Sequence, residues 1–238
     1  MDVFDPDGTI IPAEARGTNF LRVLQSQTSE VFDGDYKSMQ VSLVKRMANR
    51  WSGRVAYTLQ RSNYVGIGNP DARRVWLDND PRADYGEFSS NRTNVFAASG
   101  TWNPWRTFTV ATVVSAISGS PINETVGRDV NNDLDNNDRP IRGIDDLVRP
   151  ILSDLDDQGR AVPYGIRGPN SVTVDLSFRY QLPLGGRLES LDFFFDMFNV
   201  FNHLNEVAPS GNRSATNFMV ATSANFPYQS QLGIRLRF

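Results

Sequence analysis

The chain has 238 residues, with 24 basic against 27 acidic side chains, one histidine and no cysteine. These counts exclude disulfides and thiolate chemistry, leave too few histidines for a zinc site or a Ser-His-Asp triad, and give no support for nucleic-acid binding. No segment approaches the run of about 18 apolar residues that a membrane-spanning helix needs.

Strand-like segments follow one another along the chain, and in most of them apolar and polar residues alternate. Such alternation indicates a strand with two different faces. Most segments are about 9–12 residues long, the length that a tilted strand needs to cross a membrane. The expected strands cover residues 20–28, 36–47, 54–60, 94–102, 107–117, 172–182, 188–201 and 228–238.

The connections between these strands are alternately very short and very long. Short breaks are predicted at 48–53, 103–106 and 183–186, and long polar stretches at 65–91, 119–170 and 203–226. This alternation is typical of the periplasmic turns and extracellular loops of a transmembrane β-barrel. Aromatic residues gather near both kinds of connection, which predicts two interfacial girdles. They are Trp51, Trp102, Trp105, Tyr180 and Phe238 near the short turns, and Tyr36, Tyr64 and Tyr228 near the long loops.

The last strand carries the strongest indication of a membrane barrel. Leu232, Ile234 and Leu236 share one face, whereas Arg235 and Arg237 lie on the other. Two arginines do not enter a dry protein core without partners, but they do face a water-filled lumen. The sequence therefore predicts an all-β fold, an antiparallel transmembrane β-barrel segment of about eight long strands.

A closed barrel of eight strands has an interior just wide enough for side chains to fill. The inward-facing set of this chain includes Arg54, Asp175, Arg179, Arg235 and Arg237. Burying so many charged groups in a narrow lumen is costly unless nearly all are paired. We therefore expect an open, curved sheet with strand 228–238 at one edge. The other edge is expected near Phe20 or within the first dozen residues.

The alternative is a soluble β-sandwich that binds a carbohydrate or another ligand. Its ligand would contact the loop aromatics Trp76, Tyr85, Phe88 and Tyr164. The two architectures differ in what covers the aliphatic face of the strands: a sandwich buries this face in its core, and a barrel exposes it to lipid. Long structureless loops inside a compact sandwich count against this alternative.

Several segments resemble a known family. Phe198-Asn-Val-Phe-Asn-His203, followed by the terminal strand, looks like the C-terminal end of TonB-dependent outer-membrane receptors. Segments 36–46, 56–59, 129–133 and 137–140 match in the family's order, and the nearest subgroup is the Oar-like receptors with a carboxypeptidase-regulatory-like domain. The resemblance implies TonB-energised uptake of a large scarce solute (a siderophore, cobalamin, glycan or peptide) across the outer membrane of a Gram-negative-type bacterium. It implies no enzymatic activity.

The resemblance also implies partners. Such receptors have about 22 strands and a lumen plugged by an N-terminal domain. The chain (residues 1–238) is therefore expected to be the C-terminal part of a receptor barrel without its plug, so that TonB would be reached only through the plug. Outer-membrane lipid, the barrel assembly machinery and the N-terminal part of the barrel are the other expected partners. Gly233, Leu236 and Phe238 are expected to form an assembly signal.

One acidic loop is a candidate metal site. Asp129, Asn131, Asp133 and Asp135 alternate, and oxygen ligands at this spacing suit Ca²⁺. However, Leu134 occupies the place of the turn glycine of an EF-hand loop, and no glutamate closes the loop. A solvated acidic loop with local Asx turns is the favoured interpretation, with Ca²⁺ in the Asp129–Asp138 loop as the alternative.

Overall fold

The computed structural model describes residues 3–4, 10–11, 34–65, 81–130, 136–147 and 149–238. Its main element is an antiparallel sheet of eight strands in the order β12-β11-β10-β7-β6-β4-β3, with β5 paired to β4. The strands are β3 (Asp35–Ala48), β4 (Trp51–Val65), β5 (Tyr85–Glu87), β6 (Asn94–Trp105), β7 (Phe108–Ile117), β10 (Ser171–Pro183), β11 (Ser190–Phe198) and β12 (Gln229–Arg237).

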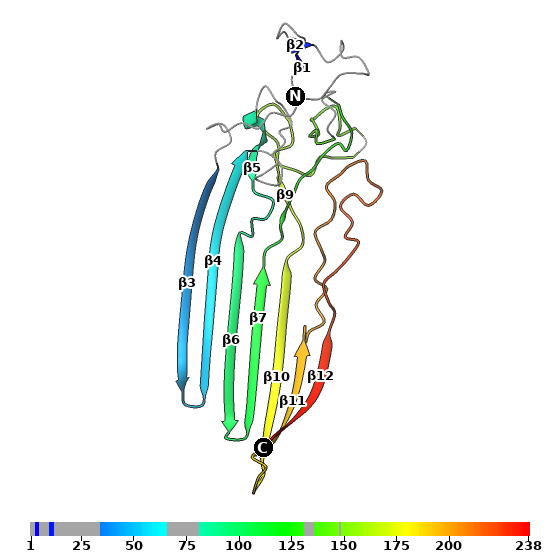
Figure 1. The fold of residues 1–238 in the computed structure, drawn as a ribbon. Coiled ribbons are helices and arrows are strands. Elements are labelled where there is room, and N and C mark those ends of the chain that lie inside the picture. Colours follow the sequence, from blue (N-terminus) through cyan, green and yellow to red (C-terminus); the bar gives the residue numbers. More distant parts are fainter. Residues whose placement is uncertain (1–2, 5–9, 12–33, 66–80, 131–135, 148) are drawn as a thin grey trace.

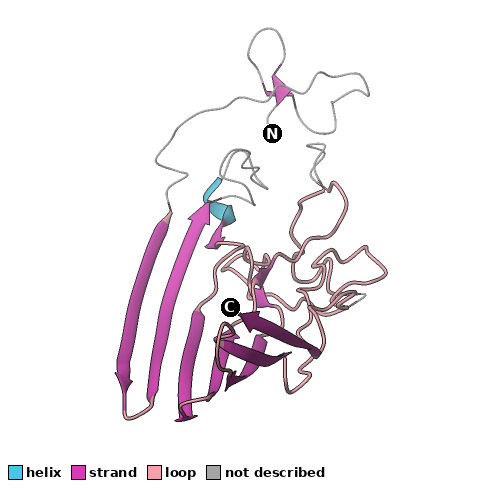
Figure 2. Cartoon of the chain, turned by 60° about the horizontal axis from the view of Figure 1, so that its bottom comes forward, coloured by secondary structure: helices cyan, strands magenta, loops and turns pink. Residues whose placement is uncertain are grey.

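The sheet is curved and does not close, since its edge strands β3 and β12 are not paired with each other (Figure 2). This confirms the predicted open antiparallel sheet with the terminal strand at one edge. Among the described residues the other edge is β3, and the expectation for the first dozen residues was wrong, because β1 (Val3–Phe4) and β2 (Ile10–Ile11) form a separate two-stranded sheet. The strand expected at 20–28 lies outside the described residues.

The short connections all lie at one end of the sheet, which we call the turn end, and the long ones at the other, the loop end (Figure 1). Asn49 and Arg50 both have positive φ, 53° and 68°, and Ala48 pairs with Trp51. Two such residues give a type I′ turn, whose twist matches that of the flanking strands.

Three strands differ from the prediction. β4 extends from Trp51 to Val65, beyond the expected 54–60, so only Asn49 and Arg50 remain of the expected break at 48–53. The pairing of β6 with β7 shifts between Trp102 and Trp105, so β6 continues to Trp105, into the expected turn at 103–106. Such a bulge inserts residues on one strand without ending it. The strand expected at 188–201 is shorter, because Asn199, with φ of 48°, turns the chain after Phe198.

Smaller elements occur at the loop end. The 3₁₀ helix η3 (Pro81–Asp84) precedes β5, and β8 (Pro121–Ile122) pairs with β9 (Ile166–Arg167). The sequence had predicted only polar loop here. Within the residues that the structure describes, no helix is long and apolar enough to span a membrane.

The register gives the sheet two distinct faces. Across the seven long strands, apolar side chains stand on the same face, which we call the apolar face. The opposite face, the polar face, carries mostly polar, charged and small side chains. The apolar face includes Met39, Val41, Leu43, Val55, Tyr57, Leu59, Phe96, Val110, Val114, Val174, Leu176, Phe178, Phe193, Phe195, Leu232, Ile234 and Leu236.

The apolar face is uncovered. Leu43 is 70% exposed and Leu232 76%, and no second sheet lies on this face among the residues that the structure describes. In the part of the chain that the structure describes, the buried hydrophobic residues Val65, Ile122, Val126 and Ala161 lie instead at the loop end. A sandwich would bury the aliphatic face, so the soluble β-sandwich alternative does not fit.

The register also corrects the predicted aromatic girdles. Trp51, Trp102 and Tyr180 stand on the apolar face near the turn end, as expected. Tyr36 and Tyr64, in contrast, stand on the polar face, because each lies an odd number of residues from the apolar set of its strand. The Tyr36 hydroxyl donates there to Gln60 Oε1 at 3.0 Å.

Candidate functional site

The polar face of β10, β11 and β12 carries rows of paired polar side chains. Ser177, Asp196 and Gln231 lie side by side across the three strands. Asp196 accepts hydrogen bonds from Ser177 Oγ at 2.5 Å and from Gln231 Nε2 at 3.0 Å. The carboxylate is therefore held in place on the sheet surface by residues of both neighbouring strands.

A second row lies nearer the turn end. Arg237 Nη2 is 2.7 Å from Asp192 Oδ2, and Ser190 Oγ donates to Asp192 Oδ1 at 3.1 Å. The Arg237 side chain is 51% exposed. Ion pairs that keep this much contact with solvent avoid most of the desolvation cost that a buried pair incurs.

The rest of the polar face is also suited to contact with water. The guanidinium-bearing side chains of Arg54, Arg179 and Arg235 are exposed on it. Ser42, Thr58 and Ser99 of β3, β4 and β6 are short and leave the surface open. A face of this kind can line an aqueous passage but cannot form a dry core.

At the loop end, a buried ion pair joins two distant segments. Arg139 Nη2 is 2.7 Å and Arg139 Nε 2.9 Å from Asp84 Oδ1, and neither side chain has any exposed surface. Arg139 also donates to Asn123 Oδ1. Buried charges need close partners for their polar atoms, so this pair fixes η3, through its last residue Asp84, against the 119–170 connection.

A second ion pair ties the 203–226 connection to the same region. Arg213 Nη1 is 2.5 Å from Glu124 Oε1, and Glu124 Oε2 accepts from the backbone and hydroxyl of Ser153. The Arg213 guanidinium also donates to the carbonyls of Asp145 and Arg149. The η3 segment and the 119–170 and 203–226 connections are therefore joined into one head at the loop end of the sheet.

Two titratable groups of this head are perturbed. Burial raises the pKa of Tyr164 above its usual range. Burial would also raise the pKa of Asp156, but hydrogen bonds from Arg160 and its charge outweigh it and lower the pKa. Asp156 Oδ1 accepts from the backbone of Gln158 and Arg160 at 2.9 Å each, which closes an Asx-type turn.

The loop aromatics that the structure describes make contacts within the protein at the loop end. The Phe88 ring lies 5.7 Å from that of Tyr64, and the Tyr85 hydroxyl donates to Asp35 Oδ1 at 2.5 Å. Trp76 lies outside the described residues. Aromatic pairs at this distance stabilise the packing of a loop, so these side chains are engaged with the protein itself.

The predicted calcium site falls largely outside the described residues. Asn131, Asp133 and Asp135 lie in the segment 131–135, and Asp129 is half-buried beside it. Asp138 is buried, and its Oδ2 accepts from the backbone of Val130 at 2.5 Å. In the described part of the chain, no group of three or more histidine, aspartate or glutamate side chains is arranged to hold a metal ion. Calcium binding stays a prediction.

The residues of the expected assembly signal lie along β12. Leu236 pairs with Leu191 on the apolar face, and Phe238, which follows the strand, is 90% exposed. Gly233 stands on the polar face opposite Phe194 of β11. Their role in assembly stays a prediction.

Sequence reasoning missed the two buried ion pairs and the contact of Phe194 with Gly233. The partners of the pairs are 55 and 89 residues apart, so no local spacing indicates them. For the second contact the sequence offers a weak signal. Phe193 and Phe195 belong to the apolar face, and Phe194 between them places a third aromatic side chain on the polar face, where the alternation calls for a polar residue.

The chain matches a protein-family model over most of its length. The model described as an outer membrane beta barrel domain matches residues 11–231. Among curated proteins, none matches the chain.

Proposed function

Because the chain belongs to the outer membrane beta barrel domain family and resides in the outer membrane, we propose that it forms part of the wall of a solute-transporting barrel. The observation that carries this proposal is the contrast between the two faces. Exposed aliphatic side chains cover one face, and the ion pair of the half-exposed Arg237 with Asp192 lies on the other. The first face suits lipid and the second suits water.

We propose further that the transport is TonB-energised uptake of a large scarce solute, such as a siderophore, cobalamin, a glycan or a peptide. The support for this is the ordered resemblance of several segments, with the terminal strand, to Oar-like TonB-dependent receptors. The polar face would then meet the plug, which couples such barrels to TonB. The proposal assigns no catalytic role to the chain.

The water-lined face is tested with a matched pair of cysteines on adjacent residues of β6. Ser99 lies on the polar face and Ala98 on the apolar face, where it pairs with Val55. In outer-membrane vesicles, Ser99→Cys should react with a charged, membrane-impermeant thiol reagent, and Ala98→Cys only with a lipid-soluble maleimide. Equal reaction of both cysteines with the charged reagent would contradict a barrel wall.

The energised step needs a separate test in the native host. Uptake of ferric siderophores, cobalamin, oligosaccharides and peptides is measured with and without the intact gene, and with and without a proton-gradient uncoupler. We expect the uptake of one of these solute classes to be lost when the gene is removed, and also when the uncoupler is added to cells that have the intact gene. Gene-dependent uptake that survives the uncoupler would indicate a passive pore instead.

A further inference from the structure

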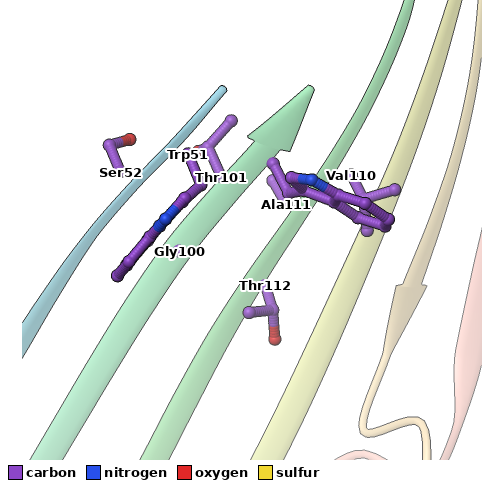
Figure 3. A pocket seen from close by; sticks show the side chains of 8 residues that line it. Trp51, Ser52, Gly100, Thr101, Val110, Ala111 and Thr112 are labelled. Carbon is purple, nitrogen blue, oxygen red and sulfur yellow. The ribbon is translucent and has the colours of Figure 1, made fainter. Parts of the chain in front are cut away.

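Two adjoining hollows lie near the turn end of the sheet, each of about 400 Å³. They share Trp51, Ser52 and Gly100. Figure 3 shows the side chains that line the first of them. One extends across β6 to β7 and the other across β4 to β3. Trp51 and Gly100 belong to the apolar face by register, as do Trp102, Leu43 and Val55. The hollows therefore form one slot in the face that meets lipid.

Glycines make the floor of this slot. Gly53 and Gly100 are direct partners on β4 and β6, so no side chain projects from either strand at this level. A Cβ atom on Gly100 would lie 3.7 Å from Ser52 O and from Thr112 Cγ2, which is ordinary contact distance. The gap at Gly100 is thus a consequence of the missing side chain, because the backbone leaves room for one there. A Cβ atom on Gly53 would lie closer, 3.3 Å from Ser99 O.

Indole rings border the slot on its turn side. Trp51 and Trp102 are direct partners one layer nearer the turn, and they are 46% and 54% exposed. Tryptophan prefers the boundary between hydrocarbon and lipid headgroups. The slot therefore begins at the headgroup level and extends into the hydrocarbon layer, as an acyl chain does.

The turns beside the slot are strongly basic. Residues 45–50 and 103–107 contain four basic residues (Lys45, Arg46, Arg50 and Arg106) and no acidic one. Lys45 Nζ lies 3.9 Å from the centre of the Trp51 ring and donates to Ala48 O and Trp51 O at 2.9 Å each. Its charge is thereby fixed at the slot while its hydrogen bonds are used within the protein.

Three arginines of the same turns are exposed, namely Arg46, Arg50 and Arg106. Arg50 Nη1 donates to Pro104 O at 2.6 Å and so bridges the β3–β4 and β6–β7 turns. Within the described part of the chain, no carboxylate forms an ion pair with any of the three. The positive charge at this position is therefore available to an anion of the membrane surface.

We propose that this slot binds one anionic glycerophospholipid, with an acyl chain on Gly53 and Gly100 between the indoles and the phosphate among Arg50, Arg106 and Arg46. The apolar slot and the basic rim complement the two parts of such a lipid, and guanidinium groups suit phosphate oxygens. The occupant is a phospholipid of the leaflet at the turn end. The binding of this lipid is separate from the proposed transport role and does not depend on TonB.

Native mass spectrometry of the full chain in a mild detergent tests the proposal. The lipids supplied are phosphatidylglycerol, phosphatidylcholine with the same acyl chains, and lipid A. We expect preferential retention of phosphatidylglycerol and a loss of about fivefold for each of Arg50→Gln and Arg106→Gln. Gly100→Leu, which fills the floor of the slot, should reduce retention by a similar factor.

The third short turn supplies matched controls. Arg187→Gln removes an exposed charge there, and Gly185→Leu adds a side chain where nothing lies within 4 Å. Neither should change retention. Equal retention of phosphatidylcholine, preference for lipid A, or a Gly100→Leu chain that binds as the wild type does would each overturn the proposal.

A second measurement covers the case in which Gly100→Leu does not fold. Wild-type chain is irradiated with phosphatidylglycerol that carries a photoreactive group in its acyl chain, and the cross-linked peptides are sequenced. We expect cross-links concentrated in residues 43–55 and 100–112. An even distribution over the apolar face would show only the general contact of a barrel with its bilayer and would refute a specific site.

Discussion

Gly233 of β12 lies directly beneath the ring of Phe194 of β11. The two residues are direct partners in the sheet, and a Cβ atom on Gly233 would stand 2.2 Å from ring atoms Cε2 and Cζ. Only the absence of a side chain at Gly233 allows the ring to lie flat over the edge strand. An aromatic ring over a glycine is a known means of protecting an edge position and pinning register.

Gly233→Ala should therefore destabilise the terminal strand. We expect a loss of about 1–3 kcal/mol, the usual cost of overpacking, in urea titrations of the detergent-solubilised chain. Phe194→Ala in the same chain removes the clash and should restore much of the loss. If Gly233 acts only as a signal that the assembly machinery reads, Phe194→Ala will not rescue the folded level in cells.

The buried Asp84–Arg139 pair should be required for the loop head. In Asp84→Ala the buried Arg139 guanidinium loses its nearest counter-charge. The free energy of unfolding should fall by about 3–5 kcal/mol. Limited proteolysis should show faster cleavage within 119–170. Arg128→Gln is the control, because Arg128 is 68% exposed and lies 3.9 Å from Asp145, and such pairs contribute about 0–1 kcal/mol. Equal cleavage of both variants would contradict the prediction.

The Asp156 turn should weaken in acid. The pKa of Asp156 is lowered from 3.8, so folding is favoured by its ionised form. This contribution is present above pH 3.8 and is lost as the pH falls through the lowered value. Hydrogen exchange at the Gln158 and Arg160 amides should accelerate over that acid range relative to neighbouring amides. Asp156→Asn keeps an acceptor oxygen and should show no such acceleration, and a parallel change in both chains would refute this role.

The turn end should face the periplasm. Short turns are typical of the periplasmic side of outer-membrane barrels and long loops of the outside. A cysteine at Ser210, in the loop head, should be labelled by an impermeant reagent on intact cells. A cysteine at Gly185 should be labelled only after the outer membrane is permeabilised. The reverse pattern would invert the orientation, and it would also move the phospholipid slot to the other leaflet.

Calcium should order the acidic loop if Asp129, Asn131, Asp133 and Asp135 are its ligands. The ion would offset repulsion among clustered carboxylates, so binding should release heat in calorimetry at millimolar Ca²⁺. Replacing Asp133 by Asn should weaken the signal, whereas Asp146→Asn, on a separate turn, should not. The absence of any heat would support the solvated acidic loop.

The alternation along each strand was sufficient to predict the architecture. Side chains in a strand alternate strictly, so Leu232, Ile234 and Leu236 had to share a face whatever their neighbours were. The contrast of short and long connections was an equally local signal. An open antiparallel sheet with β12 at its edge follows from such patterns, together with the charge on the polar face.

Only the tertiary structure decided which residues of different strands meet. Tyr36 and Tyr64 were expected at the lipid boundary, but the register places them on the polar face. The Asp84–Arg139 and Glu124–Arg213 pairs, the ring of Phe194 over Gly233, and the slot above Gly53 and Gly100 all join residues from separate segments. Contacts of this kind depend on strand register and loop packing, which a periodic pattern within one strand does not specify.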